Sequence, residues 1–290
     1  MANLKEVRTR IASVSSTQQI TSAMKMVSAA KFRRAQNAIV GMRPYAAQLN
    51  EIIASIDVAD GVRTPYHAAR EVKRVVLVVV TSNKGLCGAF NSNVLKLAQQ
   101  RIDHWRGAKA EISVLSIGKK SSEQLTRQKD LRVSVHDELL DAPAFDAVAQ
   151  LADGLMTDFA EKRIDRVELI YNQFKNSLSQ ILSCEQFLPV APASKSSSSK
   201  SDIGNDYIFE PSKEDIMREM VPLTLRSTFY RVVLDSLAAE HGARMTAMQK
   251  ATDNATELLK DLRLSYNKAR QASITNEIIE IVSGSEALKG

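Results

Sequence analysis

The chain has 290 residues, of which 44% are hydrophobic and 25% are charged, and its net charge is +6. This composition is typical of a soluble, folded protein. No apolar run approaches the roughly 18–20 residues that span a bilayer, and the first residues are charged from Lys5 onward. We therefore expect a cytoplasmic protein without a signal peptide, a transit peptide or a transmembrane helix.

Cys87 and Cys184 are the only two cysteines, and the four histidines are dispersed along the chain. A metal site needs three or four converging ligands, usually with short local spacing. The sequence therefore predicts no metal site. Two lone cysteines in a cytoplasmic chain are most often small buried hydrophobic residues.

Residues 3 to about 58 are expected to form one long helix, because the segment is rich in Ala and has no proline before Pro44. An apolar coiled-coil stripe runs along it and is interrupted at residues 15–18. The stripe consists of Leu4, Val7, Ile11, Val14, Ile20, Met24, Val27, Ala35, Ala38 and Met42. The first 50 residues hold eight Lys or Arg against Glu6 alone, a net charge of +7. A basic helix of this kind suits an acidic partner, such as nucleic acid, anionic lipid or an acidic protein surface, or is a solvated face.

Residues 70–190 alternate strand and helix signals. Five strands are expected at residues 74–82, 111–117, 131–135, 166–174 and 180–188, and the last two are expected to form a hairpin. Helices are expected at residues 92–105 and 121–128 and from Pro143 to Phe159. Strands separated by helices predict a Rossmann-like α/β domain with a mostly parallel sheet.

A Gly-bearing loop, Asn83–Phe90, follows the first strand and precedes a helix, where a phosphate-binding loop would lie. It contains neither of the Gly-rich patterns that bind nucleotides, and we expect no cofactor. Loops at the carboxyl end of a strand are exposed by topology, so this position favours an accessible Cys87 thiol.

Residues 191–206 are rich in Ser and Lys and predict a flexible surface loop. From residue 207 to 290 the chain is expected to be helical, with Pro222 as a break, a kink or the first residue of the long helix. A heptad seam of nearly five repeats follows. Its positions are His241, Met245, Met248, Thr252, Ala255, Leu259, Leu262, Tyr266, Ala269 and Ser273.

Short connections to the central domain bring the helices of residues 1–60 and 207–290 together as an antiparallel coiled coil. In the expected register Leu4 lies opposite roughly Ser265, and Val27 opposite roughly Gly242. Residues from Tyr266 onward then have no partner within the chain, although they include an apolar stripe. Exposed apolar stripes at helical spacing usually mark a partner site, with a homodimer or a frayed end as the alternatives.

Four separated segments together resemble the gamma, or central-stalk, subunits of F-type ATP synthases over essentially the whole chain. They are ITSAMKMV at residues 20–27, GLCGAFN at residues 85–91, EHGARMTAM at residues 240–248 and YNKARQASITNEIIEIV at residues 266–282. Ser22 departs from the family pattern, which usually has a basic residue there. The Ser-rich segment looks like an insertion.

The resemblance implies a non-catalytic rotor shaft inside a ring of three alpha and three beta subunits, peripheral to the cytoplasmic face of a bacterial inner membrane. Rotation of the membrane c ring by protons would drive ATP synthesis. The resemblance also implies two sets of contact residues. Contacts with the alpha–beta head fall on Met24, Lys84, Cys87, Arg270, Gln271, Thr275 and Glu277, and contacts with the c ring and the epsilon subunit fall on Tyr207, Phe209 and Glu210. A nucleic-acid-binding coiled coil and a Rossmann-like enzyme remain the alternatives.

Overall fold

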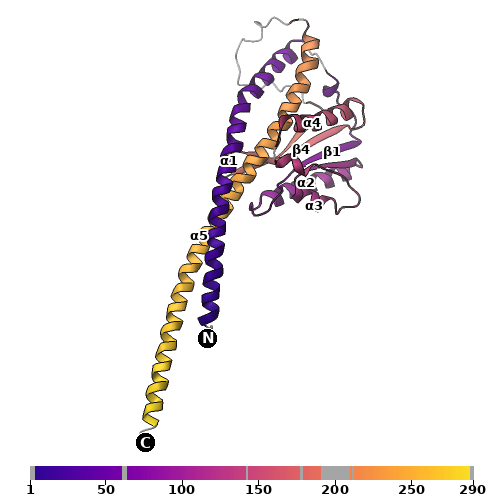
Figure 1. The fold of residues 1–290 in the computed structure, drawn as a ribbon. Coiled ribbons are helices and arrows are strands. Elements are labelled where there is room, and N and C mark those ends of the chain that lie inside the picture. The colour runs from indigo at the N-terminus through magenta and orange to yellow at the C-terminus, as the bar shows by residue number, and fades with distance from the viewer. Residues whose placement is uncertain are drawn as a thin grey trace. The chain divides into compact units, whose positions relative to one another are not determined.

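The computed structural model describes residues 4–60, 64–141, 143–176, 179–190, 210 and 212–287 (Figure 1). By their internal contacts they form two compact units. One consists of the residues up to Ser28 and from Met245 onward, and the other of Ala29–Arg244. The helices α1 (Leu4–Asp60) and α5 (Lys213–Ala287) contribute to both units. None of the helices in the described part of the chain is long and apolar enough to cross a membrane.

The larger unit is built on a five-stranded sheet with the order β3-β2-β1-β4-β5. The strands are β1 (Arg74–Val80), β2 (Glu111–Ile117), β3 (Arg132–Val135), β4 (Arg166–Phe174) and β5 (Gln180–Leu188). The first four run parallel, and β5 forms an antiparallel hairpin with β4. The α/β class and the mostly parallel sheet predicted from the sequence are confirmed.

Helices cover both faces of this sheet, which explains why β1 reads as a continuous apolar run. Figure 1 shows α4 (Phe145–Ala160) on one side of β1 and β4, and α2 (Phe90–Gly107) and α3 (Lys119–Leu125) on the other. The odd-numbered valines of β1 pack with α2, and the even-numbered ones pack with α4 and with residues 217–233 of α5. Two 3-10 helices, Pro65–His67 and Asp137–Leu140, complete the unit.

The long helix α5 begins at Lys213, and Pro222 lies inside it rather than at its start. The Ser212 side chain explains why the helix begins here. Its hydroxyl accepts a hydrogen bond from the Asp215 amide at 3.1 Å and donates one to the Asp215 carboxylate at 2.7 Å. This arrangement caps the free amides of the first turn. Buried Met217 and Val221 then hold the first turns in the core, so the helix continues through the proline.

In the smaller unit α1 and α5 pair antiparallel, as expected, but about one turn away from the expected register. The Gln18 amide donates to the Thr256 hydroxyl at 2.7 Å, and the hydroxyl oxygens of Thr21 and Thr252 lie 2.8 Å apart. The expected register would set Thr21 opposite Met248. Four residues correspond to about one helical turn.

The seam of α1 also differs from the expected apolar stripe. The less exposed positions keep an uninterrupted 3,4 spacing, which passes through polar side chains at residues 18, 21, 25 and 28. Ile20, Val27 and Ala38 are instead exposed, the first two by 57% and 58%. The seam of α5 is confirmed: every predicted position from Met245 to Ser273 is buried or half-buried. The predicted Ser-rich loop at residues 191–206 lies outside the described residues.

Candidate partner-binding surfaces

The loop between β1 and α2 places Cys87 differently from the expectation. Its side chain is 2% exposed and packs with Phe90 and Ala239, and its Sγ lies 3.3 Å from the Asn91 side-chain nitrogen. The predicted accessibility of this thiol is therefore wrong. Gly88, with φ of 61°, lets the chain turn so that the small thiol points inward.

The same loop exposes Lys84 and Leu86 instead. Leu86 is 65% exposed and has a backbone φ of 63°. That conformation favours glycine, so a leucine in it is unusual. The sequence carries a signal for the loop, its two glycines, but none that tells which of its side chains faces outward.

The side chain of Arg244, on α5, binds the backbone of this loop. Its Nη2 donates to the Lys84 carbonyl at 2.7 Å and to the Gly85 carbonyl at 3.3 Å, while Nη1 donates to Glu240 at 2.6 Å. Burial raises the pKa of Glu240 despite this ion pair. Burial, with the nearby positive charges of Arg244 and Lys31, lowers the pKa of the adjacent His241 to about 4. The cluster is thus a buried clamp for the loop.

The carboxyl ends of β1 and β2, where open α/β folds bind ligands, are filled by the protein's own side chains. The Gly118 amide donates to the Asp137 carboxylate at 3.2 Å, and the Lys119 amide donates to the Asn83 side chain at 3.1 Å. The Ser121 amide donates to the Thr81 hydroxyl at 2.9 Å. A phosphate at this position would have to displace these groups.

Backbone packing closes this region further. Gly118 has a φ of 115°, and a Cβ placed on it would lie 2.5 Å from the Thr81 carbonyl oxygen. The chain therefore runs against the end of β1 with no room for a ligand between them. Within the described residues, no group of three or more His, Cys, Asp or Glu side chains is placed to hold a metal ion.

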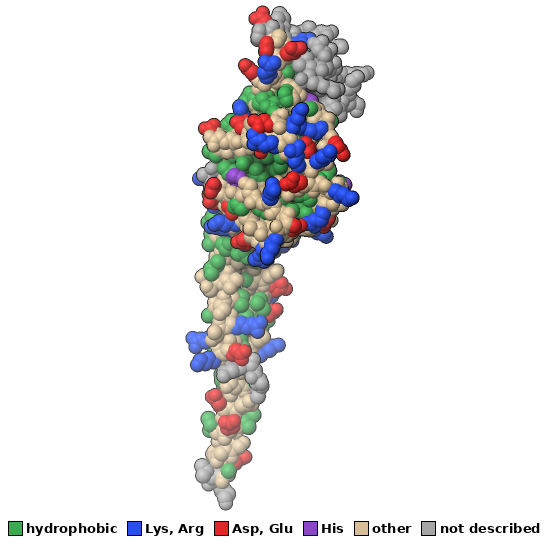
Figure 2. All heavy atoms as spheres, turned by 90° about the vertical axis from the view of Figure 1, so that its right-hand side faces the viewer, with side chains coloured by type: hydrophobic (Ala, Val, Ile, Leu, Met, Phe, Trp, Pro, Cys, Tyr) green, Lys and Arg blue, Asp and Glu red, His purple; other side chains and the backbone are tan. Residues whose placement is uncertain are grey.

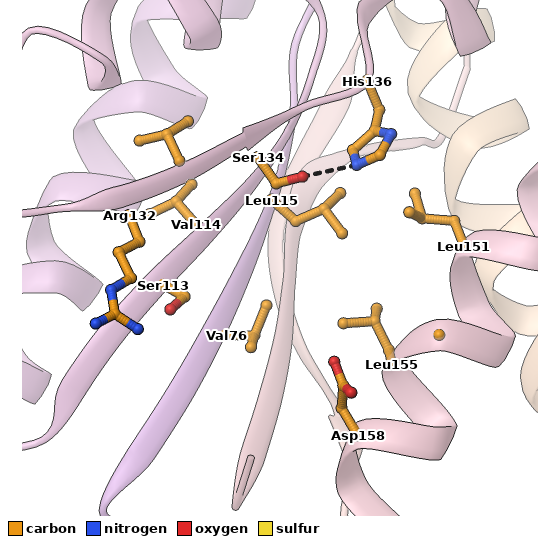
Figure 3. Close-up of a pocket in the computed structure, with 12 residues that line it drawn as sticks. Val76, Ser113, Val114, Leu115, Arg132, Ser134, His136, Leu151, Leu155 and Asp158 are labelled. Atoms are coloured by element: carbon orange, nitrogen blue, oxygen red, sulfur yellow. Dashed lines mark hydrogen bonds between the residues drawn. The ribbon is translucent and has the colours of Figure 1, made fainter. Parts of the chain in front are cut away.

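A solvent-open groove of about 390 Å³ lies between the β2–β3 end of the sheet and α4 (Figure 3). Leu115, Leu151 and Leu155 line it, and Arg132, Ser134 and Asp158 stand around its rim. Each of these three polar side chains already pairs with a neighbouring protein side chain. Figure 2 views the α/β part of the molecule and shows a hydrophobic area in the middle of that face, with Lys and Arg side chains gathered along one side. The groove has no converging set of unengaged groups that would define a ligand.

Two buried carboxylates of the sheet are structural. Burial opposes ionisation of Glu168, but hydrogen bonds from Arg101 at 2.7 and 2.8 Å and from Arg166 at 2.8 Å outweigh it and lower its pKa. Asp165 shows the same balance with Arg74. Cys184 is exposed, contrary to the general expectation of burial. Partial burial of its sulfur and the charge of Glu168 raise its pKa to about 11, which makes the thiol unreactive at neutral pH.

The expected head-contact residues of the smaller unit lie on two helices. Met24 is half-buried on α1, whereas Arg270, Gln271, Thr275 and Glu277 are all exposed on α5. The Thr275 hydroxyl donates a hydrogen bond to the Gln271 carbonyl oxygen of the same helix at 2.9 Å. Every described residue after Ser273 is exposed, and five of them are large apolar residues. These are Ile274, Ile278, Ile279, Ile281 and Val282, with exposures of 49–72%.

Of the three residues expected to contact a membrane ring, Glu210 is exposed, and Tyr207 and Phe209 lie outside the described residues. Two residues that carry the geometry of the β1–α2 loop were not singled out from the sequence as site residues. They are Leu86 and Arg244. Both fall inside segments that carried the family resemblance, which is the signal that pointed to their neighbourhood.

Comparison with known proteins gives full-length matches. The ATP synthase family profile matches residues 3–288. The chain is 53% identical to the ATP synthase gamma chain of Flavobacterium johnsoniae and 43% identical to that of Geobacter sp. (strain M21), and each match covers 100% of both chains.

Solved structures show the same architecture. The central stalk and c-ring structure of Tetrahymena thermophila mitochondrial ATP synthase matches with 26% identity and a TM-score of 0.58, over 80% of this chain and 99% of that one. The rotor of Euglena gracilis mitochondrial ATP synthase matches with 22% identity and a TM-score of 0.65, over 93% and 98% of the two chains. The second likeness speaks for the fold alone.

Proposed function

This chain belongs to the ATP synthase gamma-chain family, and from that membership we propose that it is the rotor shaft of a bacterial F-type ATP synthase. Protons that turn a membrane ring of c subunits turn the shaft. The asymmetric shaft drives each beta subunit in turn through the conformations that make ATP. In the reverse direction ATP hydrolysis turns the shaft and pumps protons.

The partners follow from this role. The paired helices of the smaller unit stand inside the ring of alpha and beta subunits, where Met24, Arg270, Gln271, Thr275 and Glu277 face the head. The basic N-terminal helix faces acidic surfaces of the beta subunits. Exposed ion pairs contribute only about 0–1 kcal/mol each, so they can break and re-form as the shaft rotates.

We assign contacts with the c ring and the epsilon subunit to Tyr207, Phe209 and Glu210. The chain is therefore peripheral to the cytoplasmic face of the inner membrane and is held there through the c ring. Bacterial gamma chains among the relatives support this location.

One observation carries the mechanical role. The seam of α5 ends at Ser273, yet the helix runs on to Ala287 with exposed apolar side chains that include Ile281, 72% exposed. Apolar surface of this kind, on a stretch of helix that no other described segment of the chain covers, is a docking surface. A surrounding ring of subunits suits it, since such a ring provides apolar contact on every side of one helix.

We also propose that the chain has no catalytic site. The positions where a Rossmann-like fold binds phosphate are taken by Asp137 and Asn83, and Gly118 packs against β1. The relatives named above give no support to the nucleic-acid-binding alternative. The Rossmann-like enzyme alternative would need nucleotide to displace the protein's own hydrogen bonds.

Co-purification tests the proposal. The chain, tagged and expressed in its native cells, should bring down an ATPase from detergent-solubilised membranes, while the isolated chain should neither hydrolyse ATP nor bind it at micromolar concentration in equilibrium dialysis. If the tagged chain comes down without ATPase activity, or if the isolated chain retains one equivalent of ATP, the rotor assignment fails.

A further inference from the structure

Resting on the proposed rotor function, we propose that the amino end of the sheet binds the anionic lipid headgroups of the membrane. We define the amino-end surface as the four segments that lead into β1, β2, β3 and β4, which are residues 70–74, 106–111, 127–132 and 161–166. Because these strands are parallel, the four segments meet at one end of the sheet. They hold eleven Lys or Arg against five Asp or Glu, a net charge of +6.

Lysines carry the available charge of the amino-end surface, because most of its arginines pair within the chain. Arg74 lies 3.3 Å from the carboxylate of Asp165, and Arg132 lies 3.2 Å from that of Glu111. Three exposed lysines remain, one in each of the turns that lead into β2, β3 and β4, and none of them forms an ion pair with another described residue. They are Lys109, Lys129 and Lys162.

Two of these lysines occupy positions at which glycine is usual. Lys109 and Lys162 follow the ends of α2 and α4, with φ of 59° and 60°. Glycine is strongly enriched at this position, because a side chain is strained in the left-handed conformation. A cation near a helix end also interacts favourably with the helix dipole, but this does not account for Lys129, four residues beyond the end of α3. The charge kept at all three positions therefore indicates a partner rather than a local structural role.

A lipid surface suits these lysines better than a protein site does. An ammonium group is a point charge on a flexible stem, whereas a guanidinium group favours a fixed bidentate geometry. A rotor presents its surface in every direction during a turn, and a fluid layer of anionic headgroups offers the same attraction at each angle. An acidic protein site would instead hold the shaft at one angle. The attraction acts within about one Debye length, about 8 Å at physiological ionic strength.

The direction of the strands agrees with this assignment. Lys84, which the family resemblance assigns to the head, follows β1 and therefore lies at the opposite, carboxyl end of the sheet. The chain also leaves the sheet at the amino end, since β5 is antiparallel and Leu188 pairs with Val167 near the start of β4. From there it leads to the residues that we assign to the c ring. On this reasoning the amino-end surface faces away from the head and toward the membrane.

Flotation with lipid vesicles measures the binding of the full-length chain. The chain should bind vesicles of phosphatidylcholine mixed with phosphatidylglycerol. Lys109→Gln, Lys129→Gln and Lys162→Gln together should weaken this binding by on the order of 100-fold, about five-fold for each lysine. The basic helix α1 is unchanged in this variant, so the loss reports the amino-end surface alone.

The matched control removes three exposed lysines toward the carboxyl end of the sheet and leaves the same net charge. Its substitutions are Lys96→Gln, Lys119→Gln and Lys175→Gln. This control should weaken vesicle binding far less. Equal losses in the two triple variants, or equal binding of the unchanged chain to vesicles of phosphatidylcholine alone, overturn the proposal.

Photochemical cross-linking separates lipid from protein as the partner in the assembled complex. Lys129→p-benzoylphenylalanine, in the complex reconstituted into phosphatidylglycerol-containing membranes, should give on illumination a lipid adduct of this chain that intact-mass measurement detects. Lys96→p-benzoylphenylalanine on α2 is the control and should give none. If position 129 yields only adducts with other subunits, or no adduct, the lipid assignment is overturned and the rotor role stands. A chain that does not assemble with an ATPase overturns both.

Discussion

A disulfide across the paired helices should lock the shaft internally without stopping it. The hydroxyl oxygens of Thr21 and Thr252 lie 2.8 Å apart across the seam, so Thr21→Cys with Thr252→Cys should oxidise readily. Cys184 is replaced by Ser in this background, so that no native exposed thiol is present beside the two introduced ones. Cys87 is buried and can stay.

The size of the effect follows from the chain that the bond closes. The two positions are 231 residues apart, and the chain-entropy model gives about 5 kcal/mol of stabilisation for a loop of that length. This value is an upper limit, because residual structure in the unfolded chain and strain in the bond both reduce it. Guanidinium unfolding with and without dithiothreitol measures the difference in the free energy of unfolding.

The functional assay is ATP hydrolysis by the assembled complex before and after reduction. Turnover should not change, because both helices belong to one rotating body. Val7→Cys with Leu262→Cys, the pair that the expected register would match, serves as the control and should oxidise more slowly. Preferential oxidation of the control pair would refute the observed register. Loss of turnover that dithiothreitol restores would show that the two helices must move relative to each other, which contradicts a rigid shaft.

Three further outcomes are expected. Arg101→Met leaves Glu168 buried with less compensation, and we expect denaturant unfolding to show a loss of about 3–5 kcal/mol. The pKa of His241 is depressed in the fold to about 4 from 6.5, so the unfolded chain binds the proton more tightly and stability falls as pH drops from 6.5 towards 4. His241→Gln should remove about 2–4 kcal/mol of that fall in melts at pH 7 and pH 4, and an identical pH dependence in both proteins would contradict this. Replacing Gln271 and Thr275 together by Ala should lower turnover of the complex while circular dichroism of the isolated chain stays unchanged, since both side chains are exposed and Ala favours helix.

Helix boundaries and strand boundaries were largely predictable because local chemistry sets them. The strands β2, β4 and β5 begin and end where the alternating and continuous apolar patterns place them. The sequence pattern also predicted a helix close to the observed start of α5 at Lys213, where Ser212 and Asp215 form a capping arrangement. Pro222 was expected as a break, a kink or a first residue, but core packing of Met217 and Val221 outweighs the backbone hydrogen bond that the proline lacks.

The predicted seam of α1 was wrong in part because polar residues occupy seam positions. The apolar residues of this segment predicted a seam through Ile20 and Val27. The positions that face α5 instead keep the regular 3,4 spacing and include Gln18 and Thr21. A heptad phase is a property of the backbone, and polar side chains can occupy it when they bond across the seam, as Gln18 and Thr21 do. The exposure of Ile20 and Val27 therefore becomes evident only from the position of the partner helix.

The sequence by itself determined the two long helices, the parallel sheet and the five-repeat seam of α5, because periodicity and turn chemistry act over a few residues. The tertiary structure alone decided the register of the paired helices, the burial of Cys87 and the exposure of Leu86. Each of these depends on contacts between segments far apart in the chain, such as Arg244 with the Lys84 carbonyl, 160 residues away. A single sequence records which side chains exist at those positions, but the direction in which each one points is fixed only when the distant segment packs against it.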